Sequence, residues 1–159
     1  YIGGFKSVQL DPLEENIYFF DPVLKVIGKI NIQSGKVYKV IGKPKSSTNV
    51  DYAGAVSFND ANLNKLTDFT FDKYGNIYIL YHNNLGDSNY NQPASDPIIL
   101  KASFKDNTIK QVLKIEDQFR TDSSLSQYYN FSISGLAYDY DKSIYLYGSH
   151  KPGQNPDPN

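Results

Sequence analysis

Cysteine, methionine and tryptophan are all absent from this chain of 159 residues. Without cysteine the chain can form no disulfide, no zinc–thiolate centre and no thiol nucleophile. No apolar run approaches the roughly 18 residues of a membrane-spanning helix, so we expect no membrane insertion of this segment. Because methionine is missing, we expect a piece of a longer protein whose export signal, if any, was removed or not included.

An excess of charge of either sign is also absent, since 16 Lys and Arg residues stand against 17 Asp and Glu residues. A formal net charge of −1 argues against a surface for nucleic acid or for an anionic membrane. Aromatic residues are abundant instead, with 14 Tyr and nine Phe, and both types favour strands. The composition predicts a β-rich globular chain. The lack of cysteine beside many Tyr, Asn and Ser residues favours an exported or cell-surface bacterial protein, extracellular in location.

A short motif occurs three times along the chain. Each copy has an apolar residue, Asp, a short turn, Asn or Ser, and then an Ile-Tyr pair followed by further apolar residues. The three pairs begin at Ile17, Ile77 and Ile144, which are 60 and 67 positions apart. The Asp side chain can bond backbone amides two residues on and so begin a tight turn, and Gly75 suits a residue of positive φ. The Ile-Tyr strand is apolar on both faces, which predicts a position between two layers.

A second hairpin pattern follows each of the first two copies and becomes more polar along the chain. Residues 26–32 and 36–41 form the first such pair, and residues 98–104 and 108–115 form the second. Four antiparallel strands that pass from buried to half-exposed are typical of a propeller blade. We therefore predict an all-β fold, a fragment of a β-propeller built from four-stranded antiparallel meander blades. The expected blades cover approximately residues 5–42, 65–116 and 132–150, and residues 151–159 form a Pro-rich tail or linker.

These segments resemble the NHL-repeat family of β-propellers. Residues 30–42 are similar to the end of one blade of that family and residues 61–78 to the start of the next. The resemblance covers residues 5–116 well and 132–149 more weakly, and it implies about two and a half blades. The chain departs from the family pattern in having Leu66 or Thr67 where Pro precedes the inner strand, and in repeats longer than the usual ~40–50 residues. Since a closed propeller has at least about four blades, the remaining blades are expected from the same chain or from another.

Three long connections account for the extra length, at residues 43–64, 83–96 and 117–130. They are rich in Asn, Ser, Asp and Gly, so we expect them on the surface. Five tyrosines in or beside them are candidates for contacting a protein or a glycan, since tyrosine gives a large amphipathic contact area; they are Tyr52, Tyr81, Tyr90, Tyr128 and Tyr129. Alternatively these tyrosines pack the loops onto the blades. His82 and His150 lie near strand ends, and His82 is kept as a candidate binding residue, although a lone histidine is more often an ordinary strand-end residue.

Patterns typical of metal binding or catalysis are few. The segment beginning at Asp139 has oxygen side chains at alternate positions, as a calcium loop does, so Asp139 and Asp141 are weak metal candidates. The Gly and Glu that complete such a loop are absent, and turn chemistry alone accounts for these residues. There is no Ser-His-Asp order and no phosphate-binding Gly loop, so we predict no catalytic residue and no cofactor beyond weak calcium.

The favoured interpretation is a non-catalytic binding module that contacts a protein or glycan through its long loops. One alternative is a fragment of a propeller enzyme of the metal-dependent lactonase or hydrolase type, which the resemblance implies would need Glu and Asn or Asp ligands from several blades. Glu is confined to Glu14, Glu15 and Glu116, which weakens that alternative. Another alternative is a purely structural subunit of an assembly. Propeller shape by itself does not fix a function.

Overall fold

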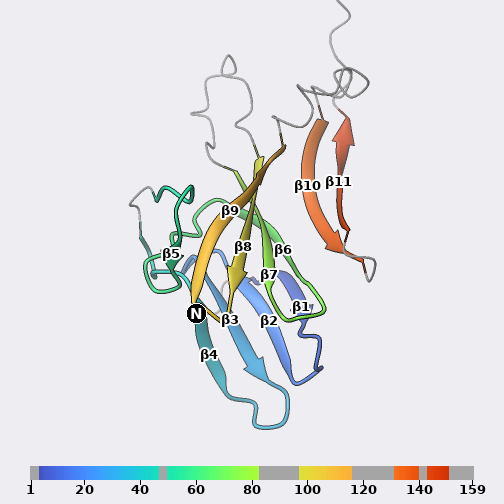
Figure 1. Cartoon of the computed structure of the whole chain (residues 1–159). Coiled ribbons are helices and arrows are strands. Elements are labelled where there is room, and N and C mark those ends of the chain that lie inside the picture. Colours follow the sequence, from blue (N-terminus) through green and yellow to red (C-terminus); the bar gives the residue numbers. More distant parts are fainter. Residues whose placement is uncertain (1–3, 47–49, 83–96, 116–130, 140–142, 151–159) are drawn as a thin grey trace, which may run out of the picture.

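The strands of the computed structural model form three separate antiparallel sheets (Figure 1). The structure describes residues 4–46, 50–82, 97–115, 131–139 and 143–150. The elements that lie wholly within these ranges are β-strands. The predicted all-β class, built from antiparallel meanders, is therefore confirmed.

Apart from β5, the strands of each sheet follow one another in chain order. Sheet 1 has the order β1-β2-β3-β4, formed by β1 (Lys6–Leu10), β2 (Asn16–Asp21), β3 (Val26–Asn31) and β4 (Val37–Ile41). Sheet 2 has the order β6-β7-β8-β9 with β5 added beside β9, formed by β5 (Val56–Ser57), β6 (Leu66–Phe71), β7 (Ile77–His82), β8 (Pro97–Ser103) and β9 (Thr108–Lys114). Sheet 3 pairs β10 (Phe131–Tyr138) with β11 (Ile144–His150).

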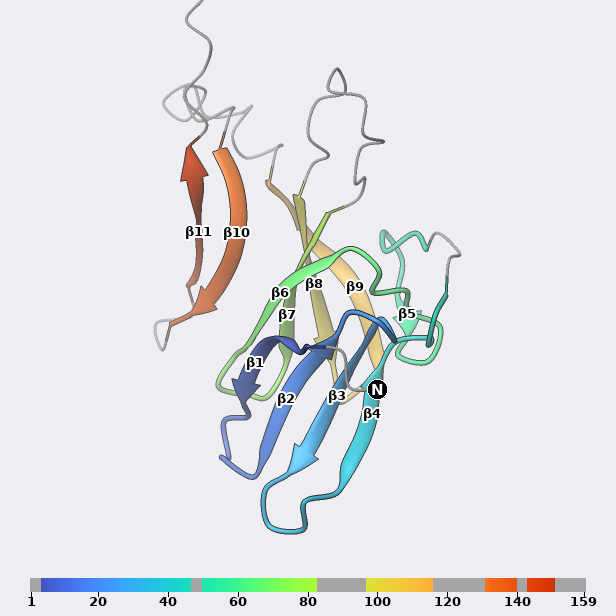
Figure 2. The same ribbon diagram turned by 180° about the vertical axis from the view of Figure 1, so that it is seen from behind.

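The first strands of the three sheets lie next to one another. Strand β6 contacts both β1 and β10, so sheet 2 stands between sheets 1 and 3 (Figure 2). From this shared inner edge each sheet extends outward strand by strand. Sheets that radiate from adjacent first strands are the blades of a propeller fragment.

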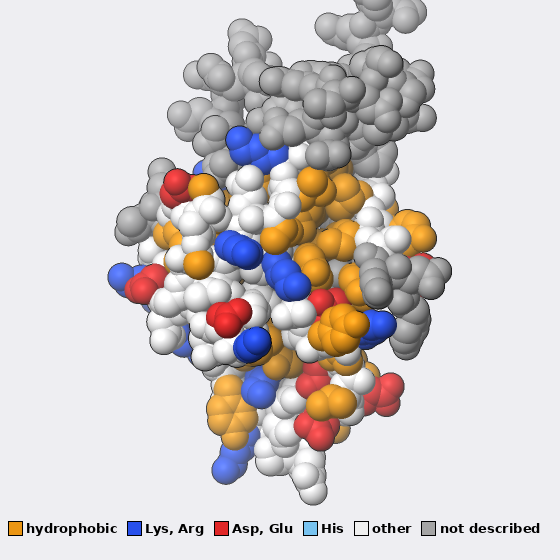
Figure 3. Space-filling model, in the orientation of Figure 1, with side chains coloured by type: hydrophobic (Ala, Val, Ile, Leu, Met, Phe, Trp, Pro, Cys, Tyr) orange, Lys and Arg blue, Asp and Glu red, His pale blue; other side chains and the backbone are white. Residues whose placement is uncertain are grey.

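Two apolar cores fill the spaces between the sheets. The larger core joins sheets 1 and 2 and includes Tyr18, Phe20, Ile27, Ile77, Ile79 and Leu100. The smaller core joins sheets 2 and 3 and includes Leu80, Ile99, Ile133 and Leu136. Hydrophobic side chains are visible where sheet 2 faces β10 and β11 in the space-filling view (Figure 3). Because Ile79 and Leu80 point into different cores, β7 is covered on both faces, as its sequence predicts.

The third Ile-Tyr strand differs from this prediction. In β11, Ile144 and Leu146 pack against the smaller core, but Tyr145 and Tyr147 are 57% and 56% exposed. The expectation of cover on both faces is therefore wrong for this copy. The reason is that no sheet in the described part of the chain lies on the outer face of sheet 3.

The repeated Asp forms the same turn in the first two copies. Asp72 Oδ1 accepts hydrogen bonds from the amides of Tyr74 and Asn76, both at 2.9 Å, and its Oδ2 accepts from Asn76 Nδ2 at 2.7 Å. Asp11 accepts from the amides of Glu15 and Asn16 and from Asn16 Nδ2 in the same way. Gly75 has a φ of 82°, as the turn prediction requires. The predicted role of this Asp as a turn former is therefore observed directly.

The connection between sheets 1 and 2 is not the surface loop that its composition suggested. Tyr52, Phe58, Ala61 and Leu63 are all buried in the larger core, and β5 adds a short fifth strand to sheet 2. Polar side chains of the segment accept hydrogen bonds from its backbone amides, while its few apolar side chains point into the core. These apolar residues are widely spaced, so the polar composition of the segment did not indicate that it is buried.

One buried carboxylate connects all three sheets at their inner edge. Asp68 of β6 accepts hydrogen bonds from Ser7 Oγ in β1, from the Leu136 amide in β10 at 3.1 Å and from Tyr147 Oη in β11 at 3.2 Å. It also accepts from the Phe69 amide at 2.9 Å. Four donors compensate for the burial of a charge, so Asp68 links the sheets where their first strands meet.

Replacing Asp72 by Ala should destabilise the fold by about 2–3 kcal/mol, because three donors lose an acceptor that is itself buried. The measurement is the free energy of unfolding in urea. Asp106 is the matched control, since it is exposed in the β8–β9 turn and accepts one bond from Ser103. Asp106→Ala should lower the free energy of unfolding by less than about 0.5 kcal/mol. Equal losses in the two variants would contradict the role of the Asp72 turn.

Candidate functional site

A groove opens between sheets 1 and 2 at the end where the β1–β2 turn and the β6–β7 turn come together. It has a volume of about 220 Å³. Its walls come from these two turns and from aromatic side chains of both sheets, namely Asp11, Pro12, Leu13, Tyr18, Phe71, Lys73, Tyr74, Gly75 and Phe104. Two copies of the repeated turn therefore form one site.

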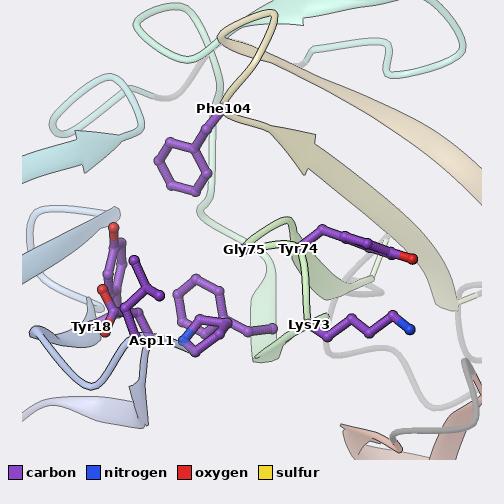
Figure 4. Close-up of a pocket in the computed structure, with 9 residues that line it drawn as sticks. Asp11, Tyr18, Lys73, Tyr74, Gly75 and Phe104 are labelled. Carbon is purple, nitrogen blue, oxygen red and sulfur yellow. The ribbon is translucent and has the colours of Figure 1, made fainter.

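Aromatic rings form the floor of the groove. The ring of Tyr18 meets Phe71 edge-on, with centroids 4.8 Å apart, and lies 6.3 Å from Phe104. Figure 4 shows Tyr18 and Phe104 facing the space between the sheets, whereas Tyr74 and Lys73 run outward from the β6–β7 turn. The rings come from β2, β6 and the β8–β9 turn, so only the stacking of the two sheets brings them together.

Large apolar side chains stand exposed at the rim. Leu13 is 76% exposed and Tyr74 is 72% exposed, the two highest values among the large hydrophobic residues that the structure describes. Both lie in turns that Asp11 and Asp72 fix through their hydrogen bonds, so the backbone beneath each side chain is held in place. Exposed apolar groups beside a hollow are typical of contact surfaces.

The polar groups of the groove are already engaged. Desolvation alone would raise the pKa of Asp11, but hydrogen bonds from Asn16 and Glu15, together with the charge of Lys29, lower it below its usual value. Burial, followed by the charge of Asp11, raises the pKa of Tyr18 to about 12, so its hydroxyl is neutral at physiological pH. The Lys73 ammonium lies 5.1 Å from the ring centroid of Tyr74. The groove therefore offers an apolar floor and a fixed rim, and no acid–base pair.

Two of the predicted binding tyrosines lie inside the core. Tyr52 is 2% exposed and Tyr81 is 4% exposed, and their rings meet at 5.4 Å. Tyr52 Oη donates to the Asn62 carbonyl at 2.7 Å and accepts from the Asn62 amide at 2.9 Å. Burial raises the pKa of both tyrosines, that of Tyr81 to about 12. Neither ring is presented to solvent, so the described arrangement is that of tyrosines packing a loop onto the sheets.

Of the other predicted tyrosine and aspartate residues, the structure describes only Asp139. Tyr90, Tyr128, Tyr129 and Asp141 lie outside the described residues. Asp139 begins the β10–β11 turn, where its amide donates to the Ser143 carbonyl at 3.0 Å and its Oδ2 accepts from Tyr145 Oη at 3.4 Å. The same backbone bond closes the turns of Asp11 and Asp72, so Asp139 occupies a turn position.

His82 ends β7 and is partly buried. Burial lowers the pKa of its imidazole, which keeps the ring neutral at physiological pH. It does not line the groove, and the nearest predicted partner, Tyr81, points into the core. Of the three predicted binding residues that the structure describes, Tyr52 and Tyr81 therefore meet in the core, and none of the three lines the groove.

Sequence reasoning missed both the groove and Asp68. Leu13 and Tyr74 are apolar residues at turn tips, and that position was the available signal. Asp68 was also visible as an acidic residue inside the apolar strand β6. Its carboxylate already accepts four hydrogen bonds, so it acts as a link between sheets.

Within the described ranges, no group of three or more His, Asp or Glu residues is placed to hold a metal ion. The same ranges contain no helix long and apolar enough to cross a membrane.

Comparison with known proteins gives little further guidance. No family model and no curated protein matches the sequence. The chain is similar to a solved structure assigned as a gluconolactonase, with 11% sequence identity and a TM-score of 0.37. The likeness covers 89% of this chain and 55% of that one, so the chain spans about half the length of the protein it matches. A likeness this distant carries no argument, and the fold stated above rests on the described strands.

Because the folded-state pKa of His82 is lowered, the unfolded chain takes up the proton first as the pH falls. The contribution of neutral His82 to the free energy of unfolding is complete above the pKa of histidine in the unfolded chain, about 6.5. It is lost as the pH drops from there towards the lower pKa in the folded chain. Urea unfolding between about pH 7.5 and 5.5 should show this loss, and His82→Gln should reduce it. The same substitution at His150 is the control. An unchanged slope in the His82 variant would contradict the prediction.

Proposed function

We propose that this chain is a non-catalytic binding module and that its groove holds an apolar segment of a partner polypeptide. The single observation that carries the proposal is the exposure of Leu13 and Tyr74 beside a hollow floored by Tyr18 and Phe71. A polypeptide side chain that enters the hollow would bury apolar area against both rim residues. Such burial is the main source of affinity at contact surfaces of this kind.

The chemistry of the groove favours a polypeptide over a glycan. Sugar recognition needs free donors and acceptors beside an aromatic platform, because every sugar hydroxyl must be compensated on binding. The carboxylate of Asp11 is already occupied by Glu15 and Asn16. The Lys73 ammonium remains as a rim charge, which suits a carboxylate on the partner segment.

The absence of a catalytic role is supported by how the nearby carboxylates are used. Asp11 and Asp72 hold turns and Asp68 links sheets, and each accepts at least three hydrogen bonds. A general acid or base must reach a substrate, whereas the hydrogen bonds of these three carboxylates commit them to turns and to the link between sheets.

The proposal includes the finer assignments made from the sequence. The blades are of the NHL type, supported by the repeated turn of Asp and then Asn or Ser before each Ile-Tyr strand. The protein is exported or displayed at a bacterial cell surface, supported by the lack of cysteine and by the load of Tyr, Asn and Ser.

The test is selection of a displayed library of random peptides on the folded chain, followed by affinity measurement for the recovered peptides. We expect the recovered peptides to contain large apolar residues. Leu13→Asp should lower the affinity of the chain for them by about tenfold, or about 1.4 kcal/mol of binding free energy. Val23→Asp is the matched control, since Val23 is 55% exposed in the β2–β3 turn and does not line the groove. It should change the affinity by less than about twofold.

Two outcomes would contradict the proposal. One is that Leu13→Asp and Val23→Asp lower the affinity for the peptides equally, which would mean that the peptides bind outside the groove. The other is that no peptide is recovered while a glycan array gives binding that Tyr74→Ala removes, which would assign the groove to sugars.

A further inference from the structure

The outer face of sheet 1 carries an apolar row that no described segment covers. Leu10, Ile17, Ile30 and Val37 are paired in register across all four strands. Leu10 is 45% exposed and Val37 is 63% exposed, while the two isoleucines between them are half-buried. We call these four residues the leading row.

Sheet 2 has the same row in the same register, and there it is covered. Phe71, Ile77, Ala102 and Ile109 are paired across β6 to β9. Ile77, Ala102 and Ile109 are 0% exposed, because sheet 1 lies on them. The leading row of sheet 1 therefore has the composition of a face that another sheet covers.

The opposite end of the stack has the complementary uncovered face. In sheet 3, Tyr145 alternates with Ile144 and Leu146, which pack on the smaller core, and it is 57% exposed. Tyr147 is also more than half exposed, although its hydroxyl reaches Asp68 at the inner edge. Sheets 1 and 3 lie on opposite sides of sheet 2 (Figures 1 and 2). The three described sheets thus leave two different apolar faces uncovered, one on each side of the row.

The two junctions within the chain share one contact. The tyrosine of the Ile-Tyr pair meets the aromatic residue that precedes the Asp in the next sheet. Tyr18 meets Phe71 at 4.8 Å, and Tyr78 stacks on Tyr138 at 6.0 Å. A lysine on the neighbouring strand covers each tyrosine, Lys29 at 5.9 Å from the centroid of the Tyr18 ring and Lys101 at 5.5 Å from that of Tyr78.

The next contact in this series joins Tyr145 to Leu10, the residue that precedes the first Asp. We propose that this contact forms between two copies of the chain, with sheet 3 of each copy packed on the leading row of the other. Contacts between unlike faces either close into a ring or continue as a filament. The described sheets of two copies number six, which lies within the four to eight blades typical of closed propellers. The proposal is therefore a closed head-to-tail dimer.

Sedimentation equilibrium of the full chain over a range of concentrations tests the assembly. We expect a species of twice the 18.0 kDa chain mass and no larger species. Val37→Lys should weaken the dimer by at least about tenfold, since it places a charge on the covered row. Val112→Lys is the matched control, because Val112 is 44% exposed on β9, the corresponding strand of sheet 2. Circular dichroism checks that both variants remain folded.

Crosslinking tests the direction of the contact, and the absence of native cysteine makes it specific. A short bis-maleimide should join a Leu10→Cys chain to a Tyr145→Cys chain when the two are mixed, and neither chain to itself. A monomer at all concentrations, a series of open filaments, equal effects of the two lysine variants, or crosslinks between two Leu10→Cys chains would each overturn the proposal.

Discussion

The structure depends on one constraint, which is that the second strand of each sheet is apolar on both faces. Such a strand is stable only between two layers, because either face alone would expose several large side chains to water. In β7 the requirement is met, since Ile79 faces sheet 1 and Leu80 faces sheet 3. At the two ends of the stack this requirement leaves apolar side chains exposed, Leu10 beside β2 and Tyr145 in β11. Sheet stacking, the two cores and the proposed dimer all follow from it.

Hydrogen bonds to carboxylates fix the details that apolar packing leaves open. Packing area is non-directional, so it brings sheets together without fixing their turns or their inner edges. Asp11 and Asp72 hold two turns in one conformation, and these turns carry the rim of the groove. Asp68 joins Ser7, Leu136 and Tyr147 at the point where the sheets meet. The rim of the groove is thus fixed by the same residue type that ends the first strand of each copy.

The prediction of individual site residues was weaker than the prediction of the strands. Tyr52 was considered for its place in a polar loop, but its ring is buried because Asn62 satisfies its hydroxyl in the core. Leu13 and Tyr74 were not considered, although their exposure makes them the rim of the groove. The groove is made from two turns about 60 residues apart, so it forms only when their two sheets become neighbours. No local sequence pattern predicts which sheets do so.

The sequence by itself determined the elements that depend on local chemistry. The Asp turn, the positive φ of Gly75 and the two-sided apolar strand follow from side chains within a few residues of one another. Only the tertiary structure decided which faces are covered, because cover depends on the neighbouring sheet. The rows led by Leu10 and Phe71 have similar composition, yet one is open and the other buried. Burial depends on which sheets become neighbours, and the sequence of a strand does not specify its position in the stack of sheets.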